Sequence, residues 1–133
     1  MAELIALEVP ATPSALSVVR MVIGGVGTRL DFSLEDLDDL FLAIDGLLQA
    51  AMEAETLERL SVRIAPDGAD LRVAVGVFES DRLQEQIALT PGGRIDLCTL
   101  LGRLVDEVTI ETVAGDNDGF LVVLLKRGSG SGM

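Results

Sequence analysis

The side chains available for chemistry in this sequence are carboxylates, amides and hydroxyls, because histidine is absent and Cys98 is the single cysteine. Without histidine, the Ser-His-Asp and Cys-His arrangements and histidine metal sites are excluded. One cysteine allows no intramolecular disulfide and no paired-cysteine zinc site. Its neighbours Leu97, Leu100 and Leu101 favour a small buried side chain over a reactive thiol. Any site must therefore use oxygen ligands, backbone groups or bound ions.

Three short clusters could bind an ion or a phosphate, and a structural role is favoured for each. The acidic residues of Glu35–Asp39 lie in the first turns of a predicted helix, where carboxylates interact favourably with the helix dipole. The glycines of Gly24–Gly27 end a predicted helix and no Lys-Ser/Thr follows, which favours helix termination or close packing over a phosphate loop. Gly115–Gly119 lacks the ligand spacing and final glutamate of a calcium loop, so we expect a turn.

Length and composition predict one domain, residues 1–127, followed by a flexible tail, residues 128–133. The net charge of -12 opposes binding to nucleic acid or to an anionic membrane surface. The sequence shows neither a secretion signal nor an apolar run long enough to span a membrane, so we expect a cytoplasmic protein. A mean hydropathy of +0.46 is high for a domain this small and predicts that a partner or a second copy covers some apolar surface.

The first half of the chain predicts one strand and two helices. Residues 3–9 alternate as a half-buried strand would, and Thr12 with Pro13 then predicts a helix start. This helix should loosen at the glycines between 24 and 27. Ser33 can cap a second helix, with Asp36 at the reciprocal capping position and apolar residues at helical spacing as far as residue 52.

The second half predicts two hairpins separated by a helix. Strands at 60–65 and 71–78 flank the turn sequence Pro66-Asp67-Gly68, and strands at 109–113 and 120–126 form the closing hairpin. Residues 79–91 are mixed and polar, and a third helix follows Gly92 and Gly93 with an apolar face that extends to Val108. The order predicts an α+β fold: a two-layer sandwich with a mixed, mostly antiparallel sheet and the helices on one face.

This order of elements, together with three stretches, resembles the Bergerat-type ATPase domain shared by histidine kinases, gyrase, Hsp90 and the small anti-sigma factor serine kinases. The last group fits best. Val9–Ala51 is similar to the strand, arginine-bearing helix and long helix that open those kinases. Gly92–Glu111 is similar to their glycine-led helix, and Gly119–Arg127 to their closing strand. The resemblance implies the histidine kinase-like ATPase fold.

The resemblance also implies positions for a catalytic acid and a metal ligand. The family carries Glu-x-x-x-Asn on its long helix, where the glutamate helps to activate the attacking group and the asparagine binds magnesium. The matching residues here are Asp45 and Gln49, which share a helical face. Asp45 is one methylene shorter than the family's glutamate and Gln49 is one methylene longer than its asparagine, so each functional group is displaced by roughly 1.5 Å. Magnesium is sensitive to such a displacement, because it demands near-ideal octahedral geometry. Asp45 and Gln49 either form a weak residual nucleotide site or simply lie at the border of the buried face of the helix, with no role in binding.

The family's adenine-binding and phosphate-binding segments are altered as well. The family follows its central hairpin with Asp-x-Gly-x-Gly, whose aspartate accepts a hydrogen bond from the adenine amino group. That aspartate would fall near Val75 or Val77, which cannot accept the bond. The glycine-rich phosphate lid is reduced to Gly92 and Gly93. We therefore expect ATP binding to be weakened or lost.

The expected function is regulation by protein contact, with a sigma factor or an antagonist of an anti-sigma factor as partner and with pairing into a homodimer. No cofactor is expected, and ATP with magnesium would bind only if the residual site functions. The alternative is an active ATP-dependent protein serine kinase that uses Asp45 as base and Gln49 toward the metal. A third possibility is that the fold serves an unrelated assembly, because fold alone does not determine function.

Overall fold

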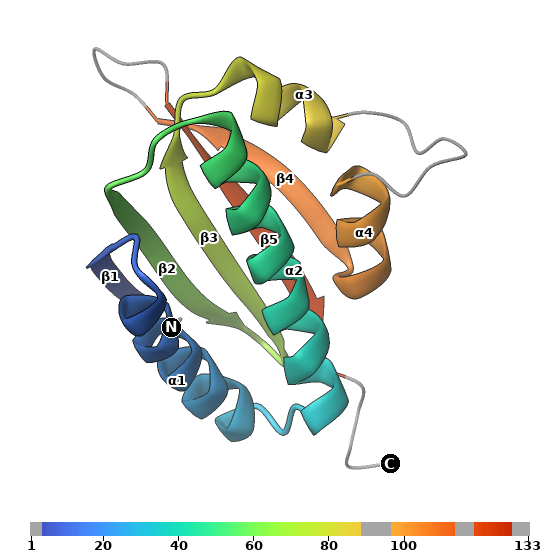
Figure 1. Ribbon diagram of the computed structural model, residues 1–133. Helices are drawn as coiled ribbons and strands as arrows, with labels where there is room; N and C mark the ends of the chain where they lie inside the picture. Colours follow the sequence, from blue (N-terminus) through green and yellow to red (C-terminus); the bar gives the residue numbers. More distant parts are fainter. Residues whose placement is uncertain (1–3, 89–96, 114–118, 129–133) are drawn as a thin grey trace.

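The computed structural model describes residues 4–88, 97–113 and 119–128, which form a five-stranded sheet covered by helices (Figure 1). The strand order is β1-β2-β3-β5-β4, and every pairing in the described part of the chain is antiparallel. The glycines at 92 and 93, most of the turn after β4 and the tail beyond residue 128 lie outside these ranges. The strands are β1 Ile5–Pro10, β2 Arg59–Asp67, β3 Asp70–Phe78, β4 Glu107–Thr112 and β5 Phe120–Arg127.

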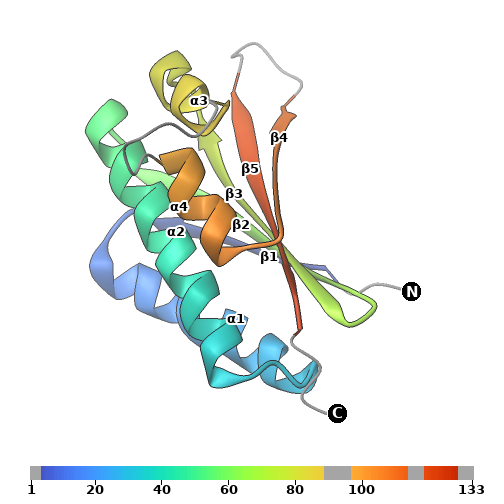
Figure 2. The same cartoon turned by 90° about the vertical axis from the view of Figure 1, so that its right-hand side faces the viewer.

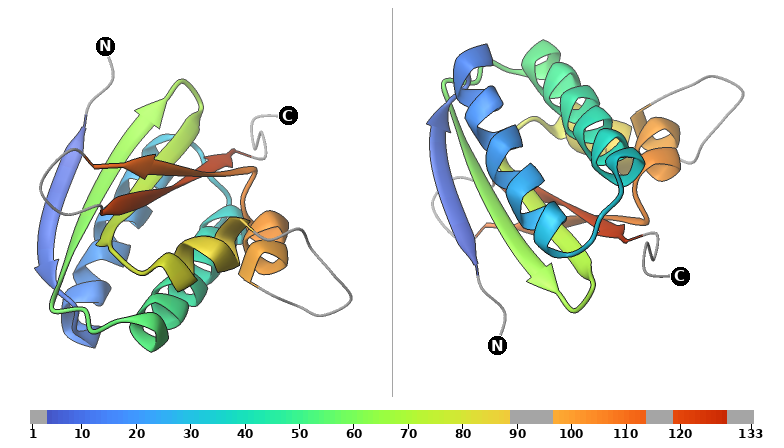
Figure 3. Two further views of the ribbon diagram at one scale, coloured as in Figure 1. Left: turned by 90° about the horizontal axis from the view of Figure 1, so that it is seen from above. Right: turned by 90° about the horizontal axis from the view of Figure 1, so that it is seen from below.

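The described helices all lie on one face of the sheet, which confirms the predicted two-layer α+β sandwich (Figure 2). None of the helices in the described ranges has both the length and the apolar character needed to cross a bilayer. Views along the sheet show α1 beside β1 at one flank, α2 in the middle and α4 at the other flank (Figure 3). The helices are α1 Pro13–Arg29, α2 Leu34–Ala54, α3 Asp81–Ala88 and α4 Leu97–Leu104.

The core lies between the helices and the sheet because alternate strand residues point toward the helices. On the three central strands these include Val62, Val73, Val75 and Val122, all almost fully buried. The predicted first strand and both predicted hairpins are confirmed. The alternation of residues 3–9 therefore predicts the first strand correctly, whereas β5 is buried along most of its length without alternation.

The start of α2 is encoded locally, and the predicted capping box is confirmed. The Asp36 backbone N–H donates to Ser33 Oγ at 3.0 Å, and the Ser33 N–H donates to Asp36 Oδ2 at 3.1 Å. These bonds satisfy two of the donors that a helix start leaves unpaired. They also fix the direction in which α2 leaves the loop after α1.

The prediction that the first helix loosens at its glycines is wrong, because α1 continues to Arg29. Close packing, the other expectation, holds at Gly27. A Cβ atom there would lie 2.6 Å from Cδ2 of Leu37, so a larger residue would require the Leu37 side chain to shift. Apolar contacts at this crossing outweigh the low helix propensity of glycine.

Two boundaries in the second half differ from the sequence expectation. The polar stretch after β3 contains α3, whose inner side carries the buried Leu83 and Ile87. The third predicted helix ends at Leu104 rather than continuing to Val108, which instead pairs with Leu124 in the sheet. Strand pairing therefore overrides the helical spacing of Val108.

Candidate functional site

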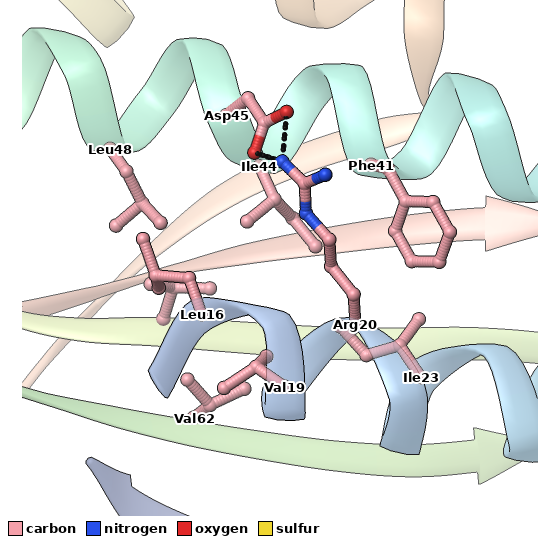
Figure 4. A pocket seen from close by; sticks show the side chains of 10 residues that line it. Leu16, Val19, Arg20, Ile23, Phe41, Ile44, Asp45, Leu48 and Val62 are labelled. Carbon is pink, nitrogen blue, oxygen red and sulfur yellow. Dashed lines mark hydrogen bonds and ion pairs between the residues drawn. The ribbon is translucent and has the colours of Figure 1, made fainter. Parts of the chain in front are cut away.

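Asp45, the predicted catalytic residue, lies on the flank of α2 that faces α1, where it forms an ion pair with Arg20 (Figure 4). Both carboxylate oxygens of Asp45 contact Nη2 of Arg20. The two side chains are 43% and 49% exposed, so the pair sits at the rim of the interhelical cleft. Arg20 thus neutralises the carboxylate that was predicted to activate an attacking group.

The ion pair covers an apolar cleft between α1, α2 and the sheet. The guanidinium carbon of Arg20 lies 6.0 Å from the centroid of the Phe41 ring, within reach of a cation–π interaction. The space that remains below has a volume of about 10 Å³, room for about one water molecule. The cleft is lined by Leu16, Val19, Arg20, Ile23, Phe41, Ile44, Asp45, Leu48, Val62 and Val75 (Figure 4).

Gln49, the predicted metal ligand, is exposed one turn beyond Asp45 on α2. The carboxylate of Asp45 contacts Arg20 of α1, whereas Gln49 is exposed and is not among the residues that line the cleft. In the part of the chain that the structure describes, no three acidic or cysteine side chains are grouped so that they could hold a metal ion. The assignment of Asp45 and Gln49 to a nucleotide site stays a prediction.

The opposite flank of α2 contacts α4. A Cβ atom on Gly46 would lie 2.8 Å from Cδ2 of Leu100, so α4 packs directly against the backbone of α2. The predicted phosphate-binding glycines, Gly92 and Gly93, precede α4 and lie outside the described residues. Because α2 separates α1 from α4, Asp45 and the start of α4 lie on different flanks of that helix (Figure 1).

The two positions predicted for an adenine-binding aspartate lie at the end of β3. Val75 points into the core and is almost fully buried, whereas Val77 is exposed. The pairing of β3 with β5 shifts register between Val75 and Phe78. Neither valine offers a hydrogen-bond acceptor, and an aspartate in place of Val75 would put a carboxylate into the apolar core.

Glu55 has a structural role that the sequence reasoning missed. Its Oε2 atom accepts hydrogen bonds from the backbone N–H groups of Glu79 at 2.9 Å and Ser80 at 2.8 Å. Ser80 in turn caps α3, since its Oγ accepts the Leu83 N–H at 3.2 Å. Ser80 before an acidic residue is a signal that could have predicted α3. The link to Glu55 could not have been predicted, because it joins the end of α2 to a segment 24 residues away.

Lys126 ties the last strand to two helices. Its Nζ donates to the carbonyl oxygen of Leu104 at 2.8 Å and lies 3.4 Å from Oδ2 of Asp39. The lysine thereby meets the negative end of α4 and one of the acidic residues of α2. Asp39 serves this contact, which agrees with the structural role favoured for the acidic cluster.

Several curated serine-protein kinases are similar to this chain over most of its length, although no family model matches it. RsbW from Bacillus velezensis is 27% identical over 138 residues, which covers 92% of this chain and 84% of the kinase. RsbW from Bacillus subtilis is 25% identical and covers 86% of this chain. RsbW from Bacillus pumilus is 29% identical and covers 94% of this chain. All three carry the name serine-protein kinase.

A solved structure shows the same fold. The crystal structure of the RsbU and RsbW domains of a Mycobacterium tuberculosis protein matches 95% of this chain with a TM-score of 0.62 and 21% identity. This chain spans 32% of that longer chain. Together with the kinases above, the match confirms the resemblance predicted from the sequence. This chain is similar in sequence to the RsbW serine-protein kinases over most of its length, and it shares the fold of the RsbW-containing structure.

Proposed function

We propose that this chain is a regulator of the RsbW type that acts by binding other proteins, with ATP binding weakened or lost. One observation carries the proposal: the carboxylate of Asp45 is bound by Arg20 of the same chain. In the resembled kinases the matching carboxylate must be free to address the attacking group. A carboxylate whose two oxygens are both held by a guanidinium is not free to accept a hydrogen bond from an attacking group.

The residues around this position do not fit ATP and magnesium. A metal ion would have to displace Arg20 and draw Gln49 from its exposed position. Val75 and Val77 supply no acceptor for an adenine amino group. The chain therefore differs from the family at three independent contacts: those to the attacking group, to the metal ion and to the adenine ring. We derive no phosphoryl transfer from this site.

Protein contact is the function that the resemblance implies when ATP binding is lost. The partner implied by the resemblance is a sigma factor or an antagonist of an anti-sigma factor. The net charge of -12 suits a basic surface on that partner. The high proportion of apolar residues, 49%, suits pairing with a second copy.

Calorimetric titration with ATP and excess magnesium tests the proposal. We expect no binding heat and no thermal shift at ATP concentrations up to about 1 mM, the range of weak ligands. Binding tighter than about 100 μM that weakens in Gln49→Ala would refute it. Asp38→Ala is the matched control, because Asp38 is exposed on the same helix and was assigned no role at the site.

An active serine kinase is the second candidate, and the names of the homologues favour it. In that case Asp45→Asn should abolish transfer of labelled phosphate to a protein serine. Arg20→Ala should raise the transfer rate, because it frees the carboxylate. Absence of transfer in both the unaltered chain and Arg20→Ala, with both proteins folded, excludes this candidate.

A further inference from the structure

β4 lies at one end of the sheet, and its outer edge is open. The strand order places β4 beside β5 alone, so the backbone groups on its other side have no strand partner in the described part of the chain (Figure 2). Val108 and Ile110 point toward the helices, because each pairs with a buried residue of β5, yet both are only partly buried. The core is therefore incompletely covered at this edge.

A hollow of about 200 Å³ lies beside this edge, between α3, α4 and the start of β4. One water molecule needs only about 10 to 15 Å³ of such space, so the hollow has room for an aliphatic side chain. Its apolar floor consists of Ile87, Leu101, Val105 and Val108. An added strand points alternate side chains toward the same face of the sheet, and apolar pockets next to an open edge hold such side chains.

The side of β4 that points away from the helices carries two glutamates. Glu107 and Glu111 are both exposed and lie four residues apart, so they stand on the same face of the strand. Oε2 of Glu107 lies 3.8 Å from Nη2 of Arg127, and both side chains are more than half exposed, so this ion pair is weak. Glu111 pairs across the sheet with the uncharged Leu121. The edge therefore offers two carboxylates to basic residues on a neighbouring strand.

A second copy of this chain fits the β4 edge poorly. Pairing of β4 with another β4 would bring the outward glutamates of two chains together, and each chain already has a net charge of -12. Charged residues on an edge strand also discourage such pairing between copies. That role accounts for the glutamates, but it does not account for the apolar hollow beside them. Together the two features favour a basic partner.

β1, at the other end of the sheet, is less suited to an added strand. It ends in Pro10, which has no N–H to donate, and Glu8 is its single acidic residue. Both edges are open in the residues that the structure describes, but they differ chemically. β1 therefore offers a control for any measurement made on β4.

We propose that the β4 edge binds an extended segment of a basic partner protein, which adds to the sheet as a further strand. The segment carries basic residues opposite Glu107 and Glu111 and an apolar side chain that enters the hollow beside Val108. Its pattern is basic-apolar-any-apolar-basic, which reads the same in either strand direction. The inference rests on the protein-binding role put forward under Proposed function, and it adds the surface and the chemistry of the partner.

Fluorescence anisotropy of a labelled peptide tests the proposal with the full chain. The probe is Thr-Lys-Val-Thr-Val-Lys-Thr. We expect a dissociation constant on the order of 100 μM, because so short a strand buries less than the roughly 1,200 Å² of a standard interface. The same peptide with glutamate in place of both lysines should bind at least about tenfold more weakly. N-methylation of its three central backbone nitrogens should abolish binding, since strand pairing requires N–H donors.

Charge exchange locates the site on β4. Glu111→Lys should weaken binding of the lysine peptide at least about threefold and strengthen binding of the glutamate peptide. Glu8→Lys is the matched control, because Glu8 is exposed on β1 and its substitution changes the net charge equally. It should change either dissociation constant by less than about twofold.

Gly102→Leu tests the hollow independently of charge. Gly102 lines the hollow, and a Cβ atom there would meet nothing within 4 Å. The leucine should lower the affinity for the lysine peptide because it narrows the hollow. It should also raise the melting temperature, since glycine is a poor helix former. An unchanged affinity in this variant overturns the role of the hollow.

Three results overturn the proposal as a whole. They are the absence of lysine-peptide binding at about 500 μM chain, equal binding of the lysine and glutamate peptides, and self-association of the chain that Glu111→Lys strengthens. The ATP titration is a separate measurement. Nucleotide binding together with peptide binding refutes the proposed loss of ATP binding and leaves this surface in place. Absence of both overturns the surface alone.

Discussion

Breaking the ion pair between Arg20 and Asp45 should cost little stability, even though the pair carries the proposed function. Both side chains are close to half exposed, so water screens the attraction and a coupling of about 0.2 to 1 kcal/mol is expected. The contact of Arg20 with Phe41 adds about 0.5 kcal/mol at an exposed position. Arg20→Ala should therefore destabilise the fold by about 1 kcal/mol in total.

A double-mutant cycle measures the pair itself. Urea unfolding of the unaltered chain, Arg20→Ala, Asp45→Ala and the double variant gives the coupling energy free of the contact with Phe41. Arg72 and Asp67 form a matched reference pair, with an N–O distance of 3.1 Å and similar exposure. Both couplings should shrink when salt shortens the screening length.

Two results would refute this reasoning. A coupling above about 2 kcal/mol would mean that the pair is shielded from water and supports the fold, contrary to its exposure. A coupling energy of zero between Arg20 and Asp45, with a measurable coupling energy in the reference pair, would mean that the Asp45 carboxylate is not bound by Arg20 in solution. The second result would remove the observation on which the proposed function rests.

Two further substitutions test the description of the fold by urea unfolding. Gly76→Ala should destabilise by about 1 to 3 kcal/mol, because its Cβ would lie 2.7 Å from the carbonyl oxygen of Phe120 and 2.8 Å from Cδ2 of Leu121. Unchanged stability would contradict the close packing of β3 on β5. Ser33→Ala should cost about 0.5 to 2 kcal/mol through loss of the helix cap, and Ser33→Asp should restore most of it. Equal stability of all three proteins would show that the capping box contributes nothing.

Features fixed by neighbouring residues could be predicted from the sequence. The start of α2 is decided within four residues by Ser33 and Asp36, and the β2–β3 turn by Gly68, whose φ of 65° suits glycine. The alternation of residues 3–9 likewise predicted the first strand. Each of these features needs only local backbone geometry and the separation of apolar from polar side chains.

Features fixed by distant contacts could not be predicted in the same way. α3 begins where Glu55 accepts hydrogen bonds from two backbone N–H groups, and no local sequence pattern predicts that contact. Val108 fits both a helical face and a strand, and pairing with β5 decides between them. The spacing of Asp45 and Gln49 shows that they share a helix, but not that Arg20, 25 residues away, engages one of them.

The position of β5 constrains how this domain can be synthesised. β5 follows β4 in the chain, yet it lies inside the sheet between β3 and β4. Until residues 120–127 leave the ribosome, β3 presents an unpaired edge and β4 has no neighbour in the sheet. The nascent domain therefore exposes an incomplete apolar core until β5 has been synthesised. Compared with a domain whose strands pair in the order of their synthesis, we expect the folding of this domain to depend more on chaperones or on rapid synthesis of β5.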